Sequence, residues 1–298
     1  MVALSFPAML GAVAKPLRNA LSTMETFMKN RPPPNYRLPA MRVLLCGALG
    51  LLTAIPALAD SNFSWPESHH AAVSLTYDDA IAASDLDVAI PQLDRAKLKG
   101  TFFLMGRQMS PADAPRWRAA AVSGHELGNH SVNHPCSRGT FPMPTQYNSE
   151  SYSVEVLLTE IGVMNTLLTA IDGRPKHAFA TPCGQTQVGG QDYIAPLRSS
   201  GLATFIRDPS IMVGGPQGPK ILGTGFVNAT GDEMIAWVKQ VQAAGGLGVV
   251  VFHGVGGDYL AVSAQAHQQL LDYLAAHRAD IWTTTYSDAM TYVTARGH

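Results

Sequence analysis

Residues 74–80, Ser-Leu-Thr-Tyr-Asp-Asp-Ala, end a short apolar segment with two adjacent carboxylates. Leu75 and Tyr77 alternate with smaller or polar residues, which is typical of a β-strand. Asp78 and Asp79 should therefore emerge together at the carboxyl end of that strand, where α/β proteins place their chemistry. Neighbouring carboxylates repel each other, and a site that keeps both charged usually supplies a cation. Asp is also common in solvated turns after strands, so the pair alone leaves a plain turn open.

The length and composition of the chain indicate a globular protein. It has 298 residues, of which 46% are hydrophobic, enough for one large domain or two small ones. No stretch reaches the uninterrupted apolar length of about 18 residues that a membrane span needs. Residues 43–58 come nearest: they follow Met41-Arg42, are interrupted by Gly and Pro, and lead into Ala59. This pattern is typical of a secretory signal peptide, which we expect at residues 41–59; an uncleaved hydrophobic anchor is the alternative.

The segment before this signal has no strand or helix pattern. Residues 1–40 carry five basic residues, a run of three prolines and a single acid. We interpret them as a flexible leader or a misassigned start that lies outside the fold. Residues 60–298 are expected to form a single domain that is exported, either to a periplasm or to the medium.

Charge and cysteine content narrow the possible partners. Residues 60–298 contain 15 Lys and Arg against 21 Asp and Glu, a formal charge of about −6. A nucleic-acid partner is disfavoured because phosphate binding needs a basic face. Of the three cysteines, Cys46 lies in the expected signal, and Cys136 and Cys183 remain. An even pair in an exported protein suggests one disulfide, and two buried free thiols are the alternative.

Strand and helix patterns alternate along the rest of the chain. Strands are expected at 71–77, 101–105, 125–129, 177–181, 202–206, 247–253 and 281–285, with a weaker one near 221–226. Helices are expected at 86–99, 113–123, 154–170, 192–200, 231–244, 262–277 and 287–295. This order, β then α repeated about seven times, implies parallel strands, either closed into a barrel or open and doubly wound. We expect an α/β barrel in one domain.

A pair of histidines follows the third expected strand. His130 and His134 are four residues apart, and on one helical turn this spacing puts both imidazoles on the same side. The pair leaves its strand at the same end at which Asp79 leaves the first strand, and in a parallel sheet those ends share one face. Two His and one carboxylate form a catalytic metal set that leaves positions open for water and substrate. Surface or capping histidines are the plain alternative.

Two more strand ends carry candidate residues. His253 ends a fully apolar strand, where a histidine needs a polar partner that the top of a barrel can offer. A satisfied core histidine is the alternative. Thr181-Pro182-Cys183-Gly184 follows the fourth expected strand at the equivalent end.

Thr76-Tyr77-Asp78-Asp79, residues 124–134 and Phe252-His253 together resemble motifs of the polysaccharide deacetylase family, the NodB-homology carbohydrate esterases of the family 4 type. Their order and spacing match, and the resemblance covers roughly residues 71–295. It implies a distorted (β/α)7 barrel of the NodB-homology type. It also implies a hydrolase that removes N-acetyl or O-acetyl groups from an extracytoplasmic polysaccharide or oligosaccharide with the help of a metal.

The resemblance also assigns roles to individual residues. By similarity, Asp79, His130 and His134 would bind one divalent metal, usually Zn²⁺, although the set would also accept Co²⁺, Mn²⁺ or Ni²⁺. Asp78 would be the general base that takes a proton from the attacking water. His253 would be the general acid that protonates the departing sugar nitrogen or oxygen.

The third motif departs from the family pattern. The family usually offers an Arg two residues before the proline and an aromatic residue after it, and here those positions are Ala180 and Cys183. By resemblance, the backbone N–H of Cys183 would still stabilise the oxyanion. The missing Arg normally orients the base, so we expect either another cation, Arg207 or Arg138, or weakened activity. Asp208 is expected to support the catalytic histidine.

The cysteines lie near two of these motifs. Cys136 is two residues beyond a metal ligand and Cys183 stands in the third motif, so a disulfide could tie the two loops together where the family uses an aromatic residue. A nucleophilic role for Cys183 is the competing reading. It is disfavoured because no His neighbours it in sequence.

The expected function is thus that of an exported, metal-dependent carbohydrate deacetylase whose partner is an acetylated glycan. A carbohydrate- or metal-binding protein of the same fold with little turnover is the alternative that Ala180 keeps open, while retention of Asp78 and His253 argues against it. An amidohydrolase for a small non-sugar amide is a third reading, disfavoured by the signal. Selectivity for one glycan would lie in the loops 135–151 and 207–230, where sequence provides no code.

Overall fold

A fully buried strand, β1 (Ala71–Asp78), lies at the centre of the sheet. The structure is a computed structural model that describes residues 63–208, 218–257 and 259–296. All eight residues of β1 are buried, which explains why its sequence contains only apolar and small polar residues before the carboxylates. The expected leader at 1–40 and the expected signal at 41–59 lie outside the described residues.

The sheet around β1 is parallel throughout. Its other strands are β2 (Thr101–Leu104), β3 (Glu126–Asn129), β4 (Phe179–Ala180), β7 (Ile206–Arg207), β8 (Ile221–Gly225), β9 (Leu247–Phe252) and β12 (Ile281–Thr283). Their order is β7-β4-β3-β2-β1-β9-β8, and β12 pairs with the first half of β1. The fold is the distorted (β/α)7 barrel expected from the sequence, so this prediction is confirmed. Among the described residues, β7 and β8 are the two ends of the hydrogen-bonded order.

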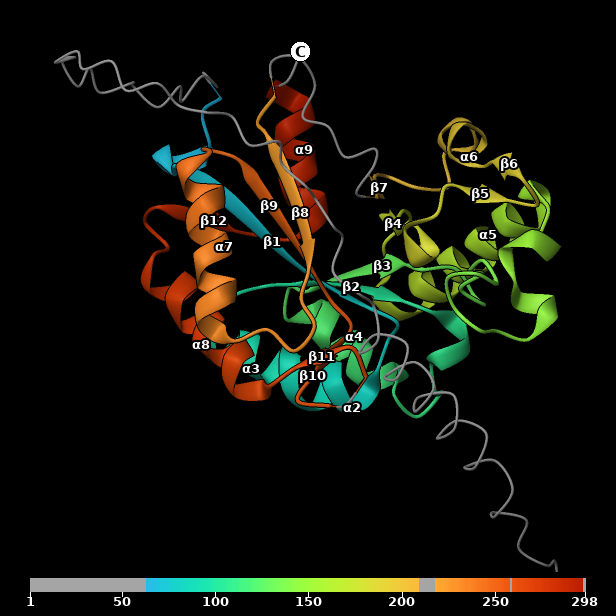
Figure 1. The fold of residues 1–298 in the computed structure, drawn as a ribbon, viewed down its shortest axis with the longest axis horizontal. Coiled ribbons are helices and arrows are strands. Elements are labelled where there is room, and N and C mark those ends of the chain that lie inside the picture. The colour runs from blue at the N-terminus through green and yellow to red at the C-terminus, as the bar shows by residue number, and fades with distance from the viewer. Residues whose placement is uncertain (1–62, 209–217, 258, 297–298) are drawn as a thin grey trace, which may run out of the picture. The chain divides into compact units, whose positions relative to one another are not determined.

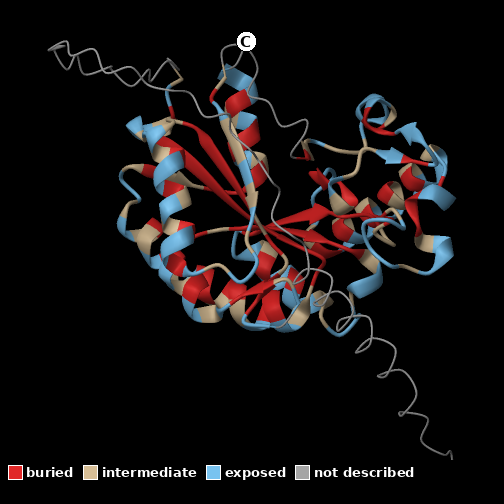
Figure 2. Ribbon diagram, viewed as in Figure 1, coloured by how far each residue is buried: buried red, intermediate tan, exposed pale blue. Residues whose placement is uncertain are grey.

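Helices follow the strands and cover the sheet. They are α2 (Ala82–Ser84), α3 (Ile90–Ala96), α4 (Ala114–Val122), α5 (Val154–Asp172), α6 (Ile194–Ser200), α7 (Gly231–Ala243), α8 (Ala264–Ala276) and α9 (Tyr286–Arg296). One apolar cluster contains Ala71, Val73, Leu75 and Tyr77 of β1 together with residues of α7 and α8, and a second contains Ala72 and residues of α9. Figure 1 shows these helices beside the sheet. Strands β1 to β4 and β9 are buried along nearly all of their length, the edge strand β8 is partly exposed, and the helices expose one side (Figure 2). The buried sheet therefore holds in place the loops that follow the carboxyl ends of its strands.

Several expected strands are shorter than their sequence patterns indicate. The strands expected at 177–181 and 202–206 are reduced to the two-residue strands β4 and β7. Two strand pairs were not expected: β5 (Gln187–Val188) with β6 (Gln191–Asp192), and β10 (Gly254–Val255) with β11 (Ala261–Val262). Segments of two residues are too short to show a sequence period, so pattern analysis cannot separate them from loops.

The expected helix at 86–99 takes an unusual form. A π-helical turn at Asp85–Ala89 comes before α3, in which Pro91 stands in the first turn. Proline has no N–H to donate and is tolerated in that turn. π-helical turns are rare and often occur beside functional sites, and this one follows the carboxylate pair by six residues.

The longest helix, α5, contributes to the core of the domain. Its length and apolar composition are sufficient for a membrane span. Leu157, Ile161, Met164, Leu168 and Ile171 are nevertheless buried within the domain, and the side chain of Asn129 on β3 donates to the Ile161 carbonyl at 2.9 Å. In the described part of the chain, α5 therefore packs one apolar face against the sheet, as amphipathic helices of α/β domains do.

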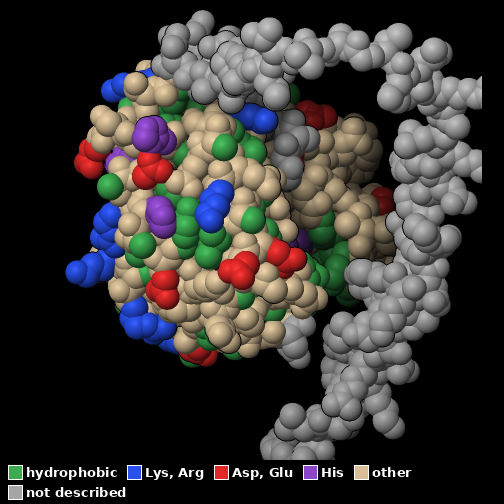
Figure 3. Space-filling model, turned by 60° about the vertical axis from the view of Figure 1, so that its left-hand side comes forward, with side chains coloured by type: hydrophobic (Ala, Val, Ile, Leu, Met, Phe, Trp, Pro, Cys, Tyr) green, Lys and Arg blue, Asp and Glu red, His purple; other side chains and the backbone are tan. Residues whose placement is uncertain are grey.

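The face of the molecule in Figure 3 shows basic and acidic side chains side by side. The described residues drawn there form no continuous basic patch of the kind that phosphate binding requires. This distribution agrees with the excess of acidic residues in the sequence.

Candidate functional site

The carboxylate pair lies at the carboxyl end of β1, as expected. Asp78 is the last residue of the strand, and Asp79 and Ala80 both have left-handed backbone angles, with φ of 77° and 60°. Such residues are costly outside glycine and persist where the surrounding structure fixes them, often at functional sites. The turn places both carboxyl groups in the interior, where Asp78 is 4% and Asp79 6% exposed.

The histidine pair lies in a loop. The prediction that His130 and His134 share one helical turn was therefore wrong. Ser131 and His134 have φ of 61° and 54°, values that a right-handed helix excludes. The Ser131 hydroxyl accepts a hydrogen bond from the His134 N–H at 2.9 Å, and Pro135 restricts its preceding residue to non-helical angles. The loop still turns His130 and His134 toward each other, with ring centroids 4.4 Å apart.

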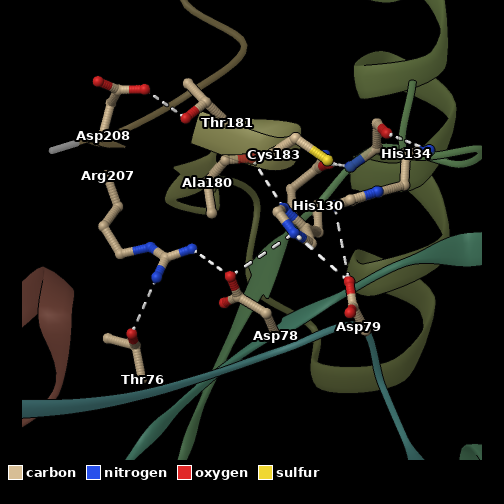
Figure 4. A network of polar contacts seen from close by, with 12 residues as sticks. Thr76, Asp78, Asp79, His130, His134, Ala180, Thr181, Cys183, Arg207 and Asp208 are labelled. Carbon is tan, nitrogen blue, oxygen red and sulfur yellow. Dashed lines mark hydrogen bonds and ion pairs between the residues drawn. The ribbon is translucent and has the colours of Figure 1, made fainter. Parts of the chain in front are cut away.

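Three side-chain atoms converge beside β1. His130 Nε2 and His134 Nε2 lie 3.7 and 3.6 Å from Asp79 Oδ1, and all three atoms lie within 4.8 Å of one another (Figure 4). Ligand atoms around a tetrahedral zinc ion are about 3.3 Å apart, given bonds of about 2.0 Å. The other ring nitrogen of His130, Nδ1, lies 2.9 Å from the Ala180 carbonyl oxygen, which leaves Nε2 toward the cluster.

The donor set fits a divalent cation. Asp79 Oδ1 is buried and has no hydrogen-bond partner among the described residues. A buried carboxylate oxygen without a partner is costly unless a cation compensates it. Burial, then the charge of His130, lowers the pKa of His134 to about 2, so the ring is neutral as a metal ligand must be. Burial together with the charge of Asp78 raises the pKa of Asp79.

The second carboxylate has its own cation. Arg207 Nη2 donates to Asp78 Oδ2 at 2.6 Å, and Arg207 Nη1 donates to the Thr76 hydroxyl at 3.1 Å (Figure 4). The guanidinium lies over the ring of Phe103, with its central carbon 4.7 Å from the ring centroid. Burial alone would raise the pKa of Asp78, but Arg207, followed by His130 and His253, lowers it below its ordinary value. Asp78 is therefore held as an oriented, charged carboxylate.

Arg207 occupies the place that the missing arginine leaves. Ala180 on β4 and Arg207 on β7 are directly paired in the parallel ladder, so their side chains start from neighbouring positions on the same face. The small side chain at 180 leaves room for the guanidinium to reach Asp78 from the adjacent strand. Of the two arginines considered from the sequence, Arg138 lies on an exposed loop, where its N–H donates to Glu150 Oε1 at 3.0 Å.

His253 and Asp208 follow β9 and β7 at the same end of the sheet. The charge of His253, after those of Arg207 and His130, contributes to the lowered pKa of Asp78. Asp208 is fully buried and accepts a hydrogen bond from the Thr181 hydroxyl, pointing away from the carboxylate pair (Figure 4). Its expected support of the catalytic histidine stays a prediction.

A disulfide links the loop after β3 to the turn after β4. Cys136 and Cys183 are bonded, with their Cα atoms 5.7 Å apart. Gln185 adds a second connection, accepting from the Ser137 N–H at 2.9 Å and donating to its hydroxyl at 3.0 Å. Cys183 has a φ of 53° and is the second residue of a short 3₁₀ turn, Pro182–Gly184, where a backbone N–H has no acceptor within the turn.

Replacing Cys136 with Ser should lower the free energy of unfolding by about 2–4 kcal/mol. The disulfide joins residues 47 positions apart and so restricts the unfolded chain. Urea unfolding of the wild type and the variant measures the loss. Reductant should cause the same loss in the wild type and none in the variant, whereas two free thiols in the intact mass of the exported protein would contradict the disulfide.

Sequence analysis predicted both carboxylates and both histidines, but it missed some of the side chains that hold them in position. Thr76 donates to the Val250 carbonyl at 2.6 Å and accepts from Arg207, and Phe103 supports the guanidinium. Thr76 lies within the first motif, and a threonine between two apolar strand positions was the signal available for it. The contact of Phe103 depends on the order of the strands, which a single sequence does not specify.

The fold and this site together define the class: a NodB-type barrel with an Asp-His-His donor set beside a second, cation-paired carboxylate. Residues 66–197 match the family model described as polysaccharide deacetylase. The chain therefore contains a polysaccharide deacetylase domain, which confirms the resemblance seen in the sequence.

Other known proteins are similar over part or most of the chain. A gellan lyase from Bacillus sp is 28% identical over 139 residues, which are 46% of this chain and 5% of that protein. The chain thus spans a small fraction of that relative.

Solved structures with similarity include two from Bacillus subtilis. The peptidoglycan deacetylase PdaC is 17% identical, with a TM-score of 0.47 over 76% of this chain and 93% of that one. The family 4 carbohydrate esterase PdaA is 14% identical, with a TM-score of 0.49 over 78% and 86%. A family 4 acetyl xylan esterase from Clostridium thermocellum is 17% identical, with a TM-score of 0.48 over 74% and 90%.

Proposed function

We propose that this protein is an exported hydrolase that removes N-acetyl or O-acetyl groups from a polysaccharide or oligosaccharide with the help of one divalent metal, most often Zn²⁺. The observation that carries the proposal is that two adjacent carboxylates have different partners. Asp79 faces two histidines through an oxygen without a hydrogen-bond partner among the described residues, while Asp78 is held by Arg207. The polysaccharide deacetylase domain supplies the substrate class.

Asp79, His130 and His134 would hold the metal, and Co²⁺, Mn²⁺ or Ni²⁺ also suit such ligands. When bound, a divalent ion lowers the pKa of water and polarises the acetyl carbonyl. The neutral His134 ring and the Ala180 contact of His130 prepare both imidazoles for this role.

The remaining residues handle protons and the developing charge. Asp78, charged and oriented by Arg207, takes the proton of the attacking water. The Cys183 N–H, in the turn fixed by the disulfide, donates to the oxyanion of the tetrahedral intermediate. His253 protonates the departing sugar nitrogen or oxygen, without which an amine would be a poor leaving group.

Asp208 is proposed to support His253. Replacing Asp208 with Asn should lower kcat/KM by roughly 10-fold, part of the 10²- to 10⁴-fold that a general acid supplies, and should alter the pH profile. Steady-state rates across a pH series measure both. Unchanged activity with an unchanged pH profile would remove Asp208 from the mechanism and leave its contact with Thr181 as a structural one.

The alternative of a binding protein with little turnover depended on the missing third-motif arginine. The contact between Arg207 and Asp78 supports turnover over binding alone, because it gives the proposed general base a cationic partner. Export follows from the expected signal at residues 41–59, and the acetylated carbohydrate is the expected partner.

The proposal is tested by metal content and turnover measured on the same preparation. The purified protein should bind one Zn²⁺ per chain, and chelator should abolish acetate release from acetylated oligosaccharides until zinc is restored. Asp79→Asn should lose both metal and activity. Stoichiometric zinc binding with no acetate from any N- or O-acetylated glycan would favour the binding-protein alternative instead.

A further inference from the structure

The two histidines of the donor set are oriented by different means. His130 Nδ1 is held by the Ala180 carbonyl oxygen at 2.9 Å, a contact that fixes the ring directly. His134 Nδ1 lies 3.4 Å from the Sγ of Cys136, and a disulfide sulfur is only a weak acceptor. The position of the His134 ring therefore depends mainly on the backbone of its own loop.

That loop is held in a costly conformation. Ser131 and His134 both have left-handed backbone angles, each of which costs of order 1–3 kcal/mol in a non-glycine residue. The loop supplies one compensating contact itself, from the His134 N–H to the Ser131 hydroxyl. A loop of this kind keeps its shape when an external group fixes it. The Gly106 and Arg107 N–H groups hold the Ser131 and Val132 carbonyls at 3.0 and 2.8 Å.

The external group that acts next to His134 is the carboxylate of Glu160 on α5. Glu160 Oε2 accepts from the Asn133 backbone N–H at 3.0 Å, and Glu160 Oε1 accepts from the Asn133 side-chain amide at 2.6 Å. Both contacts hold the residue immediately before His134. They are hydrogen bonds to an ionisable acceptor, and such bonds are stronger than neutral ones when the acceptor is charged.

The carboxylate is itself fixed from two sides. The Tyr152 hydroxyl donates to Glu160 Oε1 at 2.6 Å, and burial, then this contact, raises the pKa of Tyr152, so the phenol remains a donor. The helix that carries Glu160 is docked on β3 through the 2.9 Å contact between Asn129 and the Ile161 carbonyl. Glu160 thus connects the loop that carries His134 to the sheet, through α5 and β3.

We propose that Glu160 is a positioning residue for metal binding, acting through Asn133 to hold His134 in the donor set. The inference rests on the proposed function, because it presupposes that the set binds a metal. The family motifs seen in the sequence do not include Glu160, which lies on a helix 26 residues after His134.

The test is the affinity of the chain for Zn²⁺ and its Co²⁺ spectrum. In Glu160→Gln, the amide offers one acceptor oxygen and a donor group, so it cannot accept both Asn133 contacts. The Kd for Zn²⁺, measured by competition with a chromophoric chelator, should rise about 10- to 100-fold. The visible absorption of the Co²⁺ form should change, because His134 is no longer held in place.

Glu155→Gln is the matched control, since Glu155 lies on the same helix with an exposed side chain. It should leave both the Kd and the cobalt spectrum at wild-type values. A folded Glu160→Gln with a wild-type Kd would overturn the inference, even if its metal-free form melts earlier.

A second variant covers the case in which Glu160→Gln does not fold. Tyr152→Phe removes one donor to the same carboxylate and leaves both Asn133 contacts possible. It should raise the Kd by a smaller factor than Glu160→Gln, and a wild-type Kd in Tyr152→Phe would then overturn the inference. A wild type that binds no Zn²⁺ would instead reject the proposed function, which separates the two failures.

Discussion

Replacing Asp78 with Asn should reduce acetate release by about 10²- to 10⁴-fold, the range that a positioned general base contributes. The amide has nearly the same shape as the carboxylate but cannot take a proton from water. Asp78 Oδ2 also receives the 2.6 Å hydrogen bond from Arg207, so the variant leaves a buried guanidinium without its anion. Initial rates of acetate formation at saturating Zn²⁺ measure the effect.

The control for Asp78→Asn is metal binding. The donor set consists of Asp79, His130 and His134, so zinc stoichiometry should stay at one per chain in the variant. A variant that binds zinc normally and keeps more than about a tenth of the wild-type rate would contradict the role of Asp78, because a general base contributes at least about 10²-fold.

Replacing Arg207 with Ala should lower kcat/KM by about 10²-fold and destabilise the fold by about 3–5 kcal/mol, because it leaves the buried Asp78 charge without its partner. Asp78 would lose the cation that lowers its pKa and the hydrogen bond that orients it. Steady-state kinetics and urea unfolding measure the two losses. Arg207→Lys should keep the positive charge but not the simultaneous contacts with Asp78 and Thr76, and so recover only part of kcat/KM.

The pairing of Ala180 with Arg207 permits a sharper version of this test. Because the two residues are direct neighbours on adjacent parallel strands, about 4.8 Å apart, Ala180→Arg in the Arg207→Ala background returns the guanidinium to the family position. This exchange conserves the total side-chain volume and should restore a substantial part of kcat/KM. An Arg207→Ala variant with wild-type activity would show that the general base needs no cationic partner.

The sequence predicted those parts of the site that follow directly from strand ends. Asp78 and Asp79 could be placed because the alternating pattern of β1 stops at the carboxylates, and the parallel order brings His130 and His134 to the same face. The turn conformation of the histidine loop was missed, because a spacing of four residues suits a helix equally well. The fold class could also be predicted from local patterns, because the repeated β/α order limits the sheet to parallel architectures.

The remaining parts depend on contacts between distant segments. Arg207 was one of two candidates from the sequence, and only the pairing of β4 with β7 shows that it reaches Asp78. Glu160 could not be identified, because its position on α5 is that of a partly exposed helix residue, and its contact with Asn133 requires the docking of α5 on β3. In both cases the missing information was the spatial order of the elements rather than their type.

The most direct measurement is acetate release by the purified protein, expected to be residues 60–298, from a panel of N- and O-acetylated glycans. Each glycan is assayed with chelator, with zinc restored, and beside Asp78→Asn. We predict release from at least one glycan that chelator abolishes, zinc restores and the variant loses. Acetate release that persists in the presence of chelator, or that Asp78→Asn retains in full, would contradict a metal-dependent deacetylase with Asp78 as its base.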